Sequence, residues 1–297
     1  QSLPAAQQGE VAHRYVLGLY HIMDELTTRF PEILFEGCSS GGNRFDLGIL
    51  NYFPQIWASD NTDALCRTGI QNSYSYGYPL SVFTAHVSSC PNHQTLRITP
   101  LETRFQVASF GVLGYECNLK DLSGSDLNAI REQIALYKKW REVFQFGTFY
   151  RGTENEDSDS ETLSWTCVSP DGRRAVGLFF RRLTTPNQSH DWYRPVGLLP
   201  DVKYHFYGRN IKYNLKDFGD LVNTVSPVHI KQGSALQEIL SRFVNMDGEK
   251  EDLTAYGDTL MLAGIALKPA FAGTGYNSDT RLFPDFSSRI YFMEAVE

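Results

Sequence analysis

The fold is decided by the stretch Glu36-Gly37-Cys38-Ser39-Ser40-Gly41-Gly42-Asn43-Arg44-Phe45-Asp46, followed by Trp57-Ala58-Ser59-Asp60-Asn61-Thr62-Asp63. Each half follows a short apolar run of strand type, Ile33–Phe35 in the first and Gln55–Trp57 in the second. Each half then passes into a polar turn and a helical pattern. Two consecutive β/α units of this kind place a small-residue loop and a carboxylate at the same end of neighbouring parallel strands. In a β/α barrel that end carries the chemistry.

The segments around these motifs alternate between helix and strand patterns as far as Phe146. Apolar residues at helical spacing predict a helix from His13 to Phe30, which Pro31 stops. The sequence predicts further helices over 46–53, 63–72, 101–110 and 125–144, and strands over 32–36, 55–58, 80–87 and 112–117. We expect Thr62 or Asp63 to cap the helix that begins near residue 63. Such alternation with short connections indicates a parallel β/α sheet.

Beyond Phe146 the pattern changes to short alternating runs that are separated by turn signals, such as Ser169-Pro170-Asp171-Gly172. The predicted strands span 162–168, 175–181, 197–199, 203–207, 260–267 and 289–294. This spacing is typical of an antiparallel sandwich. The sequence therefore predicts two domains, 1–147 and 148–297. The acidic loop 154–161, near the start of the second domain, is interpreted as a solvated turn, and Trp140, Trp165 and Trp192 are expected in the core.

The composition describes a folded chain without affinity for polyanions. Of its 297 residues 42% are hydrophobic and 21% charged, which suffices for a full core. The formal net charge of −7 argues against nucleic acid or an anionic membrane as partner. No apolar run approaches the ~20 residues that a membrane span needs. Aromatic residues make up 13%; they favour a β-rich core and also suit stacking on the C–H face of a sugar.

The cysteines and histidines give no sign of a metal site. The five cysteines are odd in number and irregularly spaced, which favours free thiols in a reducing compartment. We therefore expect a cytoplasmic protein. Neither Cys-x-x-Cys nor His-x-x-x-His occurs. The five are Cys38, Cys66, Cys90, Cys117 and Cys167.

The two opening motifs resemble those of the α-galactosidases of glycoside hydrolase family 36. Blocks at 13–20, 85–88 and 91–94 extend the resemblance over about the first 145 residues, and a block at 257–261 carries a weaker one into the second half. The resemblance implies the second half of a (β/α)8 TIM barrel, followed by an antiparallel C-terminal β-sandwich. A closed barrel needs eight strands, and the sequence predicts four.

The resemblance also implies a function for the chain. The family are retaining α-galactosidases that act on terminal α-galactosyl residues of oligosaccharides such as melibiose and raffinose. Their nucleophile lies on a Lys-Trp-Asp-Met-Asn-Arg motif just upstream, and no such motif occurs here. We therefore expect the N-terminal half of the same enzyme as a partner, and a homo-oligomer. The two-carboxyl chemistry implies no cofactor.

Site residues follow from the same motifs. By the resemblance Asp60 is the acid/base, and the substrate-binding residues are Cys38, Ser39, Gly41, Gly42 and Trp57. We expect burial beside Trp57 to keep the Asp60 carboxyl protonated until it is needed. Read from spacing alone, Asp60 could instead cap the following helix, and the small-residue loop could be an ordinary tight turn. Asp63 fits a structural role in a first helical turn.

Other interpretations stay open at this point. A related α-glycosidase, such as an α-N-acetylgalactosaminidase, is one alternative. A non-catalytic carbohydrate-binding fragment is another, because the nucleophile's motif is missing. Asn43 stands where the family usually has a third glycine, which leaves substrate preference open. His86 and His93 lie at or after a predicted strand end, where they fit either catalysis or buried hydrogen bonding.

Overall fold

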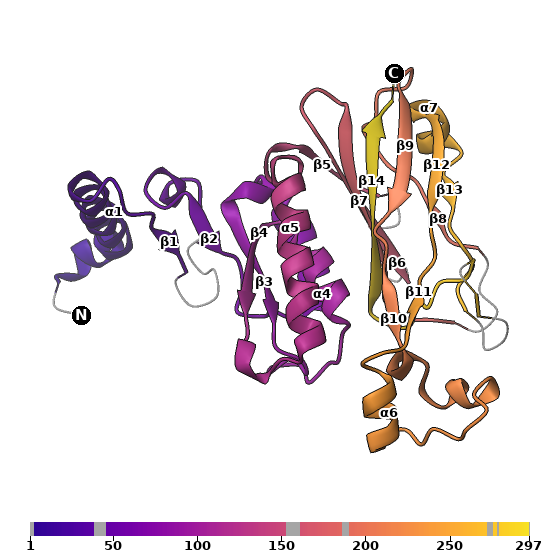
Figure 1. Ribbon diagram of the computed structural model, residues 1–297. Coiled ribbons are helices and arrows are strands. Elements are labelled where there is room, and N and C mark those ends of the chain that lie inside the picture. Colours follow the sequence, from indigo (N-terminus) through magenta and orange to yellow (C-terminus); the bar gives the residue numbers. More distant parts are fainter. Residues whose placement is uncertain are drawn as a thin grey trace.

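A computed structural model describes residues 3–38, 46–152, 161–185, 190–271, 276–277 and 279–296. The chain begins with the 3-10 helix η1 (Ala5–Glu10) and the helix α1 (Val11–Arg29), which lie at one extremity of the molecule (Figure 1). Most apolar side chains of α1, such as Val16 and Leu26, are exposed, whereas Met23 is buried. The helix predicted over 13–30 is therefore confirmed, but the described chain covers little of its apolar face.

Four parallel strands form the first sheet, in the order β1-β2-β3-β4. They are β1 (Glu36–Gly37), β2 (Gln55–Trp57), β3 (Phe83–Ser88) and β4 (Val112–Glu116). The helical elements between and after them are η2 (Ile49–Asn51), α3 (Ala64–Tyr74), η3 (Leu80–Val82), α4 (Leu101–Ala108), η4 (Leu119–Asp121) and α5 (Gly124–Phe146). The prediction of a parallel β/α sheet is confirmed.

Side-chain caps set where two of these helices begin. The carboxylate of Asp63 accepts a hydrogen bond from the Cys66 amide over 3.0 Å, so Asp63 is the N-cap of α3. Ser123 and Asp126 form a capping box at the start of α5. Both starts lie within a residue or so of the predicted ones, because capping is a local signal.

The second half is antiparallel. Six strands pair in the order β12-β9-β14-β7-β6-β5, and every neighbouring pair is antiparallel. They are β5 (Thr148–Arg151), β6 (Thr162–Val168), β7 (Arg174–Arg181), β9 (Lys203–Gly208), β12 (Asp252–Tyr256) and β14 (Ser287–Ala295). The antiparallel prediction is confirmed, and four of its strands lie within about a residue or two of the expected ranges.

Smaller elements complete this half. Two two-stranded sheets pair β8 (Trp192–Tyr193) with β13 (Ile265–Ala266), and β10 (Lys212–Asn214) with β11 (Asn245–Asp247). The helix α7 (Gly257–Leu262) follows β12. A small lobe built from η6 (Leu215–Thr224) and α6 (Ala235–Leu240) projects from one end of the large sheet (Figure 1).

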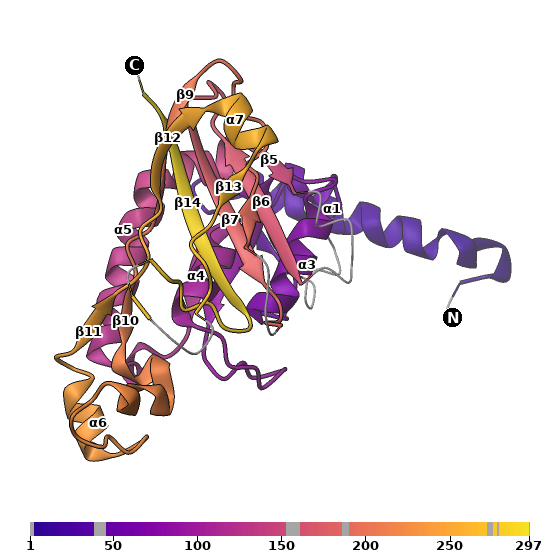
Figure 2. The same ribbon diagram turned by 90° about the vertical axis from the view of Figure 1, so that its right-hand side faces the viewer.

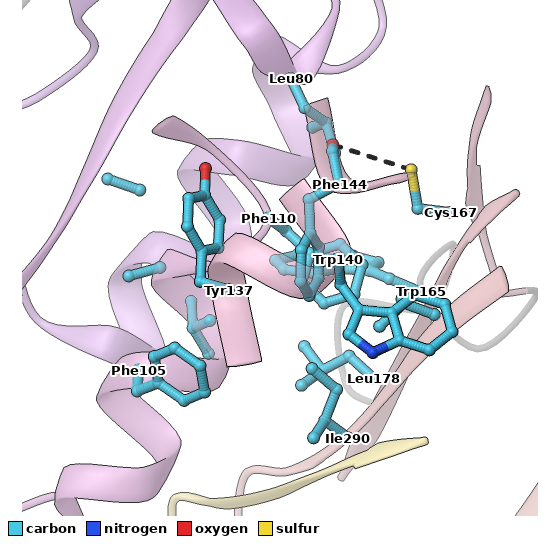
Figure 3. Packing of buried hydrophobic residues seen from close by; sticks show 14 of the residues in the cluster. Leu80, Phe105, Phe110, Tyr137, Trp140, Phe144, Trp165, Cys167, Leu178 and Ile290 are labelled. Carbon is cyan, nitrogen blue, oxygen red and sulfur yellow. Dashed lines mark hydrogen bonds between the residues drawn. The ribbon is translucent and has the colours of Figure 1, made fainter. Parts of the chain in front are cut away.

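The two halves share one core. Helices α4 and α5 lie between the parallel sheet and the six-stranded sheet (Figure 1), and Figure 2 shows the molecule from the side of the six-stranded sheet. Trp140 of α5 stacks on Phe292 of β14 with ring centroids 4.8 Å apart. Figure 3 shows Trp140, Phe144 and Trp165 of this core. The thiol of Cys167 donates to the Val143 carbonyl at the end of α5 over 2.9 Å. Burial of these rings joins the two sheets into one packed body.

Several local predictions are wrong, each for a physical reason. The strand predicted over 32–36 is reduced to its last residue plus Gly37, and Ile33 and Leu34 are exposed. Among the described residues β1 pairs with β2 alone, and no described segment covers these two side chains, so their burial cannot stabilise a longer strand. The helix predicted over 46–53 is only the short 3-10 helix η2, whose Ile49 amide donates to Oδ1 of Asp46, and Pro54 prevents it from continuing.

The strand predicted over 80–87 begins only at Phe83, because Leu80–Val82 form the 3-10 helix η3. The other corrections fall in the second half. Residues 197–199 are not a strand, because Gly197 turns the backbone at a φ of +85°. The segment 260–267 is not one strand: it begins with the end of α7, and Gly264 at a φ of +77° separates that helix from the two-residue strand β13. Trp140 and Trp165 are buried as expected, but Trp192 is 47% exposed, because successive side chains of a strand point to opposite faces and Tyr193 takes the buried face of β8. Of the acidic loop, residues 154–160 lie outside the described residues. Within the described ranges, no helix is both long and apolar enough to cross a membrane.

Candidate functional site

Four side chains gather where β2, β3 and β4 end. Trp57 is the last residue of β2, Asp60 follows in the loop, His86 lies on β3 and Glu116 is the last residue of β4. Because the strands are parallel, their carboxyl ends meet at one edge of the sheet. The sequence predicted Asp60 and Trp57 as members of this site; the involvement of Glu116 was not foreseen.

Short contacts link these four side chains in a row. The indole Nε1 of Trp57 donates to Oδ1 of Asp60 over 2.7 Å. The Trp57 and His86 rings lie with centroids 4.6 Å apart, and Nδ1 of His86 lies 3.2 Å from Oε2 of Glu116. Trp57 and His86 are half-buried, whereas both carboxylates are exposed. The row therefore presents an aromatic edge and two carboxylates to the solvent, an arrangement that can hold and protonate a polar ligand.

The expected burial of Asp60 is wrong for this chain. Asp60 is exposed, and among the described residues its recorded hydrogen bond is the one from Trp57. The loop after β2 carries Asp60 beyond the end of the strand, so only the indole edge shields it. The alternative of a helix cap also falls away, because Asp63 caps α3.

The predicted binding loop is only partly described. Cys38 follows β1 directly and is exposed. The pairing of Gly37 with Ile56 puts Cys38 at the level of Trp57, so two predicted site residues share one edge of the sheet. Ser39, Gly41 and Gly42 lie outside the described residues, as does Asn43. At the far end of the loop Asp46 accepts from the Tyr20 hydroxyl over 2.9 Å, which ties the loop to α1.

Arg67 of α3 lies beneath the Asp60 loop, and sequence reasoning missed it. Its side chain is 2% exposed. Burial lowers the pKa of Arg67 to about 10, which leaves the guanidinium charged at neutral pH. The one signal was spacing: Ala64, Arg67 and Gln71 recur at helical intervals and form the buried face of α3.

Asp63 and its partners hold the far end of the same loop. The Asp63 carboxyl is 1% exposed and lies 2.6 Å from Nη1 of Arg97. The Thr95 hydroxyl donates to it over 2.8 Å. Burial alone raises the pKa of Asp63, but hydrogen bonds from the Cys66 amide and Thr95 and the charge of Arg97 outweigh it and hold the pKa below its ordinary value. The structural role predicted for Asp63 is confirmed.

The two histidines singled out in the sequence lie in different environments, and the described residues form no metal site. His86 is a half-buried member of the row, while His93 is exposed. Within the ranges that the structure describes, no group of three or more His, Cys, Asp or Glu side chains could hold a metal ion.

Comparison with known families assigns the chain to a class. Residues 1–147 match the family described as Melibiase, and residues 162–293 match the glycosyl hydrolase family 36 C-terminal domain. The chain belongs to glycoside hydrolase family 36.

Individual relatives agree with this assignment. Alpha-galactosidase 1 of Pediococcus pentosaceus is 48% identical over 203 residues, which are 68% of this chain and 27% of that protein. AgaA, an alpha-galactosidase of Geobacillus stearothermophilus, is 45% identical over 210 residues, which are 71% of this chain and 28% of that protein.

Solved structures give the same result over nearly the whole chain. The alpha-galactosidase from Lactobacillus brevis matches with a TM-score of 0.77 at 36% identity, covering 99% of this chain and 33% of that one. A variant of Geobacillus stearothermophilus AgaA in complex with raffinose matches with a TM-score of 0.75 at 36% identity, covering 100% and 33%. The chain thus spans about a third or less of the length of these relatives.

Proposed function

We propose that the protein to which this chain belongs is a retaining α-galactosidase that hydrolyses terminal α-galactosyl residues of oligosaccharides such as melibiose and raffinose, with Asp60 as its acid/base. The observation that carries the proposal is the placement of Asp60 just beyond β2, held by Trp57 over 2.7 Å and exposed to a ligand. Membership of family 36 and the alpha-galactosidase names of the relatives support it.

We propose further that residues 1–147 are the second half of a (β/α)8 barrel and residues 148–297 a C-terminal β-sandwich. Four parallel strands are half of the eight that close such a barrel. The free side of β1 and the exposed Ile33 and Leu34 form the edge at which the N-terminal half would continue the sheet. That half would carry the nucleophile.

The proposed reaction uses two carboxyls about 5–5.5 Å apart. The nucleophile attacks the anomeric carbon while protonated Asp60 gives its proton to the departing glycosidic oxygen. Asp60, now a carboxylate, then takes a proton from the water that releases galactose and regenerates the nucleophile. Trp57 holds the Asp60 side chain through both steps. No cofactor takes part in this scheme.

The proposed galactose pocket combines Trp57 with the loop after β1. Cys38, Ser39, Gly41 and Gly42 would present backbone N–H groups to sugar hydroxyls, since small side chains let a ligand approach the backbone. The exposed position of Cys38 at the level of Trp57 supports this placement.

We also propose a homo-oligomer in the cytoplasm. The five cysteines are all free, which suits a reducing compartment. In protein extracted without reductant and then denatured, we expect alkylation of all five thiols; denaturation is needed because Cys167 is buried. Size-exclusion chromatography with light scattering measures the oligomeric state.

The acid/base role is tested in the full-length enzyme with Asp60→Asn. Raffinose needs a protonated leaving group, whereas p-nitrophenyl α-galactoside has a good leaving group. We expect turnover of raffinose to fall by ~10²–10⁴-fold and that of the activated substrate by far less. Asp201→Asn, an exposed carboxylate far along the chain, is the matched control. Equal losses on both substrates would overturn the acid assignment.

A second experiment tests the division of labour between the halves. Residues 1–297 expressed alone are expected to turn over no α-galactoside, because one carboxyl cannot serve both faces of the sugar. Sustained turnover would place the nucleophile within this chain. The substrate class is tested separately. If the full-length enzyme hydrolyses an α-N-acetylgalactosaminide faster than the corresponding α-galactoside, the protein is an α-N-acetylgalactosaminidase instead.

A further inference from the structure

Arg67 is a buried cation whose charge no carboxylate of the described chain neutralises through an ion pair. It lies on the inner face of α3 with 2% of its surface exposed. All of its recorded polar contacts are to backbone carbonyl oxygens. Burying a charge in this way is costly unless every donor is used. The arrangement therefore calls for an explanation beyond packing.

Two of the three carbonyls that Arg67 binds lie in the loop after β2 and flank Asp60, and the third belongs to the second residue of β3. Nη2 donates to the Ser59 carbonyl over 2.6 Å, and Nε donates to the Asn61 carbonyl over 2.8 Å. Nη1 donates to the Thr84 carbonyl on β3 over 3.1 Å. The guanidinium thus forms hydrogen bonds to the backbone immediately before and after Asp60 and links this loop to the neighbouring strand β3.

A second contact connects Arg67 to the side chain of Asp60. The guanidinium carbon lies 4.7 Å from the centroid of the Trp57 ring, a cation–π contact. The same indole donates to Oδ1 of Asp60 over 2.7 Å. Arg67 therefore acts on both the backbone of Asp60 and the ring that orients its carboxylate.

We propose that Arg67 is the positioning residue for Asp60: its guanidinium fixes the backbone on both sides of the carboxylate and the indole that binds it. This inference rests on the acid/base role proposed above. Arg67 touches neither substrate nor reacting atoms in this scheme. Its effect is to keep the acid within reach of the glycosidic oxygen.

The shape of the guanidinium explains why arginine occupies this position. Its planar fork carries five N–H donors in fixed directions, so one residue can serve three carbonyls at once. A lysine ammonium keeps the charge but lacks the fork and the flat face that lies over Trp57. Arg67→Lys therefore separates positioning from charge, and Arg67→Gln removes the charge while keeping a planar amide.

The test compares two substrates in the full-length enzyme. We measure kcat/KM for raffinose and for p-nitrophenyl α-galactoside in Arg67→Lys, Arg67→Gln and Asp60→Asn. The ratio of the two values does not depend on the fraction of enzyme that is folded. A misplaced acid lowers this ratio, and we expect about a tenfold to hundredfold fall in both Arg67 variants, because a displacement of about 1 Å can cost that much.

Arg104→Lys is the matched control. Arg104 is also a poorly exposed arginine that donates to backbone carbonyls, those of Ser88 and Thr99, but it makes no recorded contact with the Asp60 loop. Its substitution is expected to leave the ratio unchanged, whatever its effect on stability.

The outcomes separate the two proposals. A lowered ratio in the Arg67 variants with an unchanged ratio in Arg104→Lys supports positioning. Suppose that Asp60→Asn lowers the ratio but the Arg67 variants leave it unchanged, either because both activities fall equally or because neither falls. The positioning proposal is then overturned, and the proposed function stands. If Asp60→Asn itself lowers both activities equally, the acid assignment fails.

Discussion

The indole Nε1–H of Trp57 donates a hydrogen bond to Oδ1 of Asp60 over 2.7 Å. The donor is the last residue of β2, and the acceptor lies three positions later in the loop. The bond therefore orients an exposed carboxylate against the rigid end of a strand. A catalytic group held in this way needs little reorganisation when substrate arrives.

Trp57→Phe should lower activity while leaving the enzyme folded. Phenylalanine keeps an aromatic ring but removes the donor to Asp60, and a hydrogen bond to a charged group is worth about 1.5–3 kcal/mol. We expect kcat/KM for raffinose in the full-length enzyme to fall about tenfold or more by the same reasoning. Trp192→Phe, at an exposed tryptophan outside the site, is the control. Wild-type kinetics in Trp57→Phe would show that the bond has no role.

Asp63→Asn should make the enzyme less stable at neutral pH but not in acid. Asparagine can still cap α3, but it loses the ion pair with Arg97, which we expect to cost about 2 kcal/mol. The pKa of Asp63 is held below its ordinary value of 3.8. A carboxyl with a depressed folded pKa contributes stability that is present above its unfolded pKa and is lost as pH falls through the folded pKa.

The measurement is the apparent melting temperature of wild type and Asp63→Asn from pH 7 down to pH 3. The gap between the two proteins is expected to stay constant down to about pH 4.5 and then to narrow. Asp121→Asn, at an exposed carboxylate of η4 outside this network, is the control. A gap that widens in acid would contradict the depressed pKa.

Gly177→Ala and Gly69→Ala should shift stability in opposite directions. A Cβ at residue 177 would lie 1.9 Å from Oη of Tyr193, whose hydroxyl is anchored by Thr166 and the Trp165 carbonyl. We expect a loss of about 1–3 kcal/mol from this overpacking. A Cβ at residue 69 of α3 would meet no atom within 4 Å, so removal of a helical glycine should gain up to about 1 kcal/mol. Chemical denaturation gives the free energy of unfolding of both variants. A change of the same sign in the two would contradict the packing described around Gly177 and Gly69.

Trp165→Ala should weaken the contact between the two halves of the chain. Trp165 of β6 is fully buried, and its Nε1 donates to Asn72 of α3 over 3.3 Å. Truncation of a buried tryptophan costs about 3–5 kcal/mol. Trp192→Ala, at a half-exposed ring, should cost far less. Thermal denaturation compares the stability of the two variants. Similar losses of stability would show that the shared core contributes little to the stability of the protein.

Local signals predicted most elements of the fold. The helices α1, α3, α4 and α5 and the strand β6 lie within a few residues of their expected ranges, because periodicity and capping act over a few neighbouring residues. The errors fall where a distant partner decides. Ile33–Phe35 has the composition of a strand, but apolar side chains stabilise a strand only where another segment covers them, and Ile33 and Leu34 are exposed.

The candidate site divides in the same way. The motif around Asp60 and Trp57 could be found in the sequence, because the site residues of one β/α unit are close along the chain. The positions of Glu116 and Arg67 beside Asp60 could not be found in the sequence. Glu116 reaches the site through a parallel strand pairing, and Arg67 binds a carbonyl 17 positions away, on β3.

By itself the sequence determined the alternation of helix and strand, the change to an antiparallel pattern after Phe146, and the position of Asp60 at a strand end. Only the tertiary structure decided that Asp60 is exposed, that Asp63 pairs with Arg97, and that a buried Arg67 grips the Asp60 loop. The physical reason is the separation along the chain over which each interaction acts. Backbone propensities and caps are fixed by near neighbours, whereas burial and ion pairing depend on which distant segments the packed core brings together.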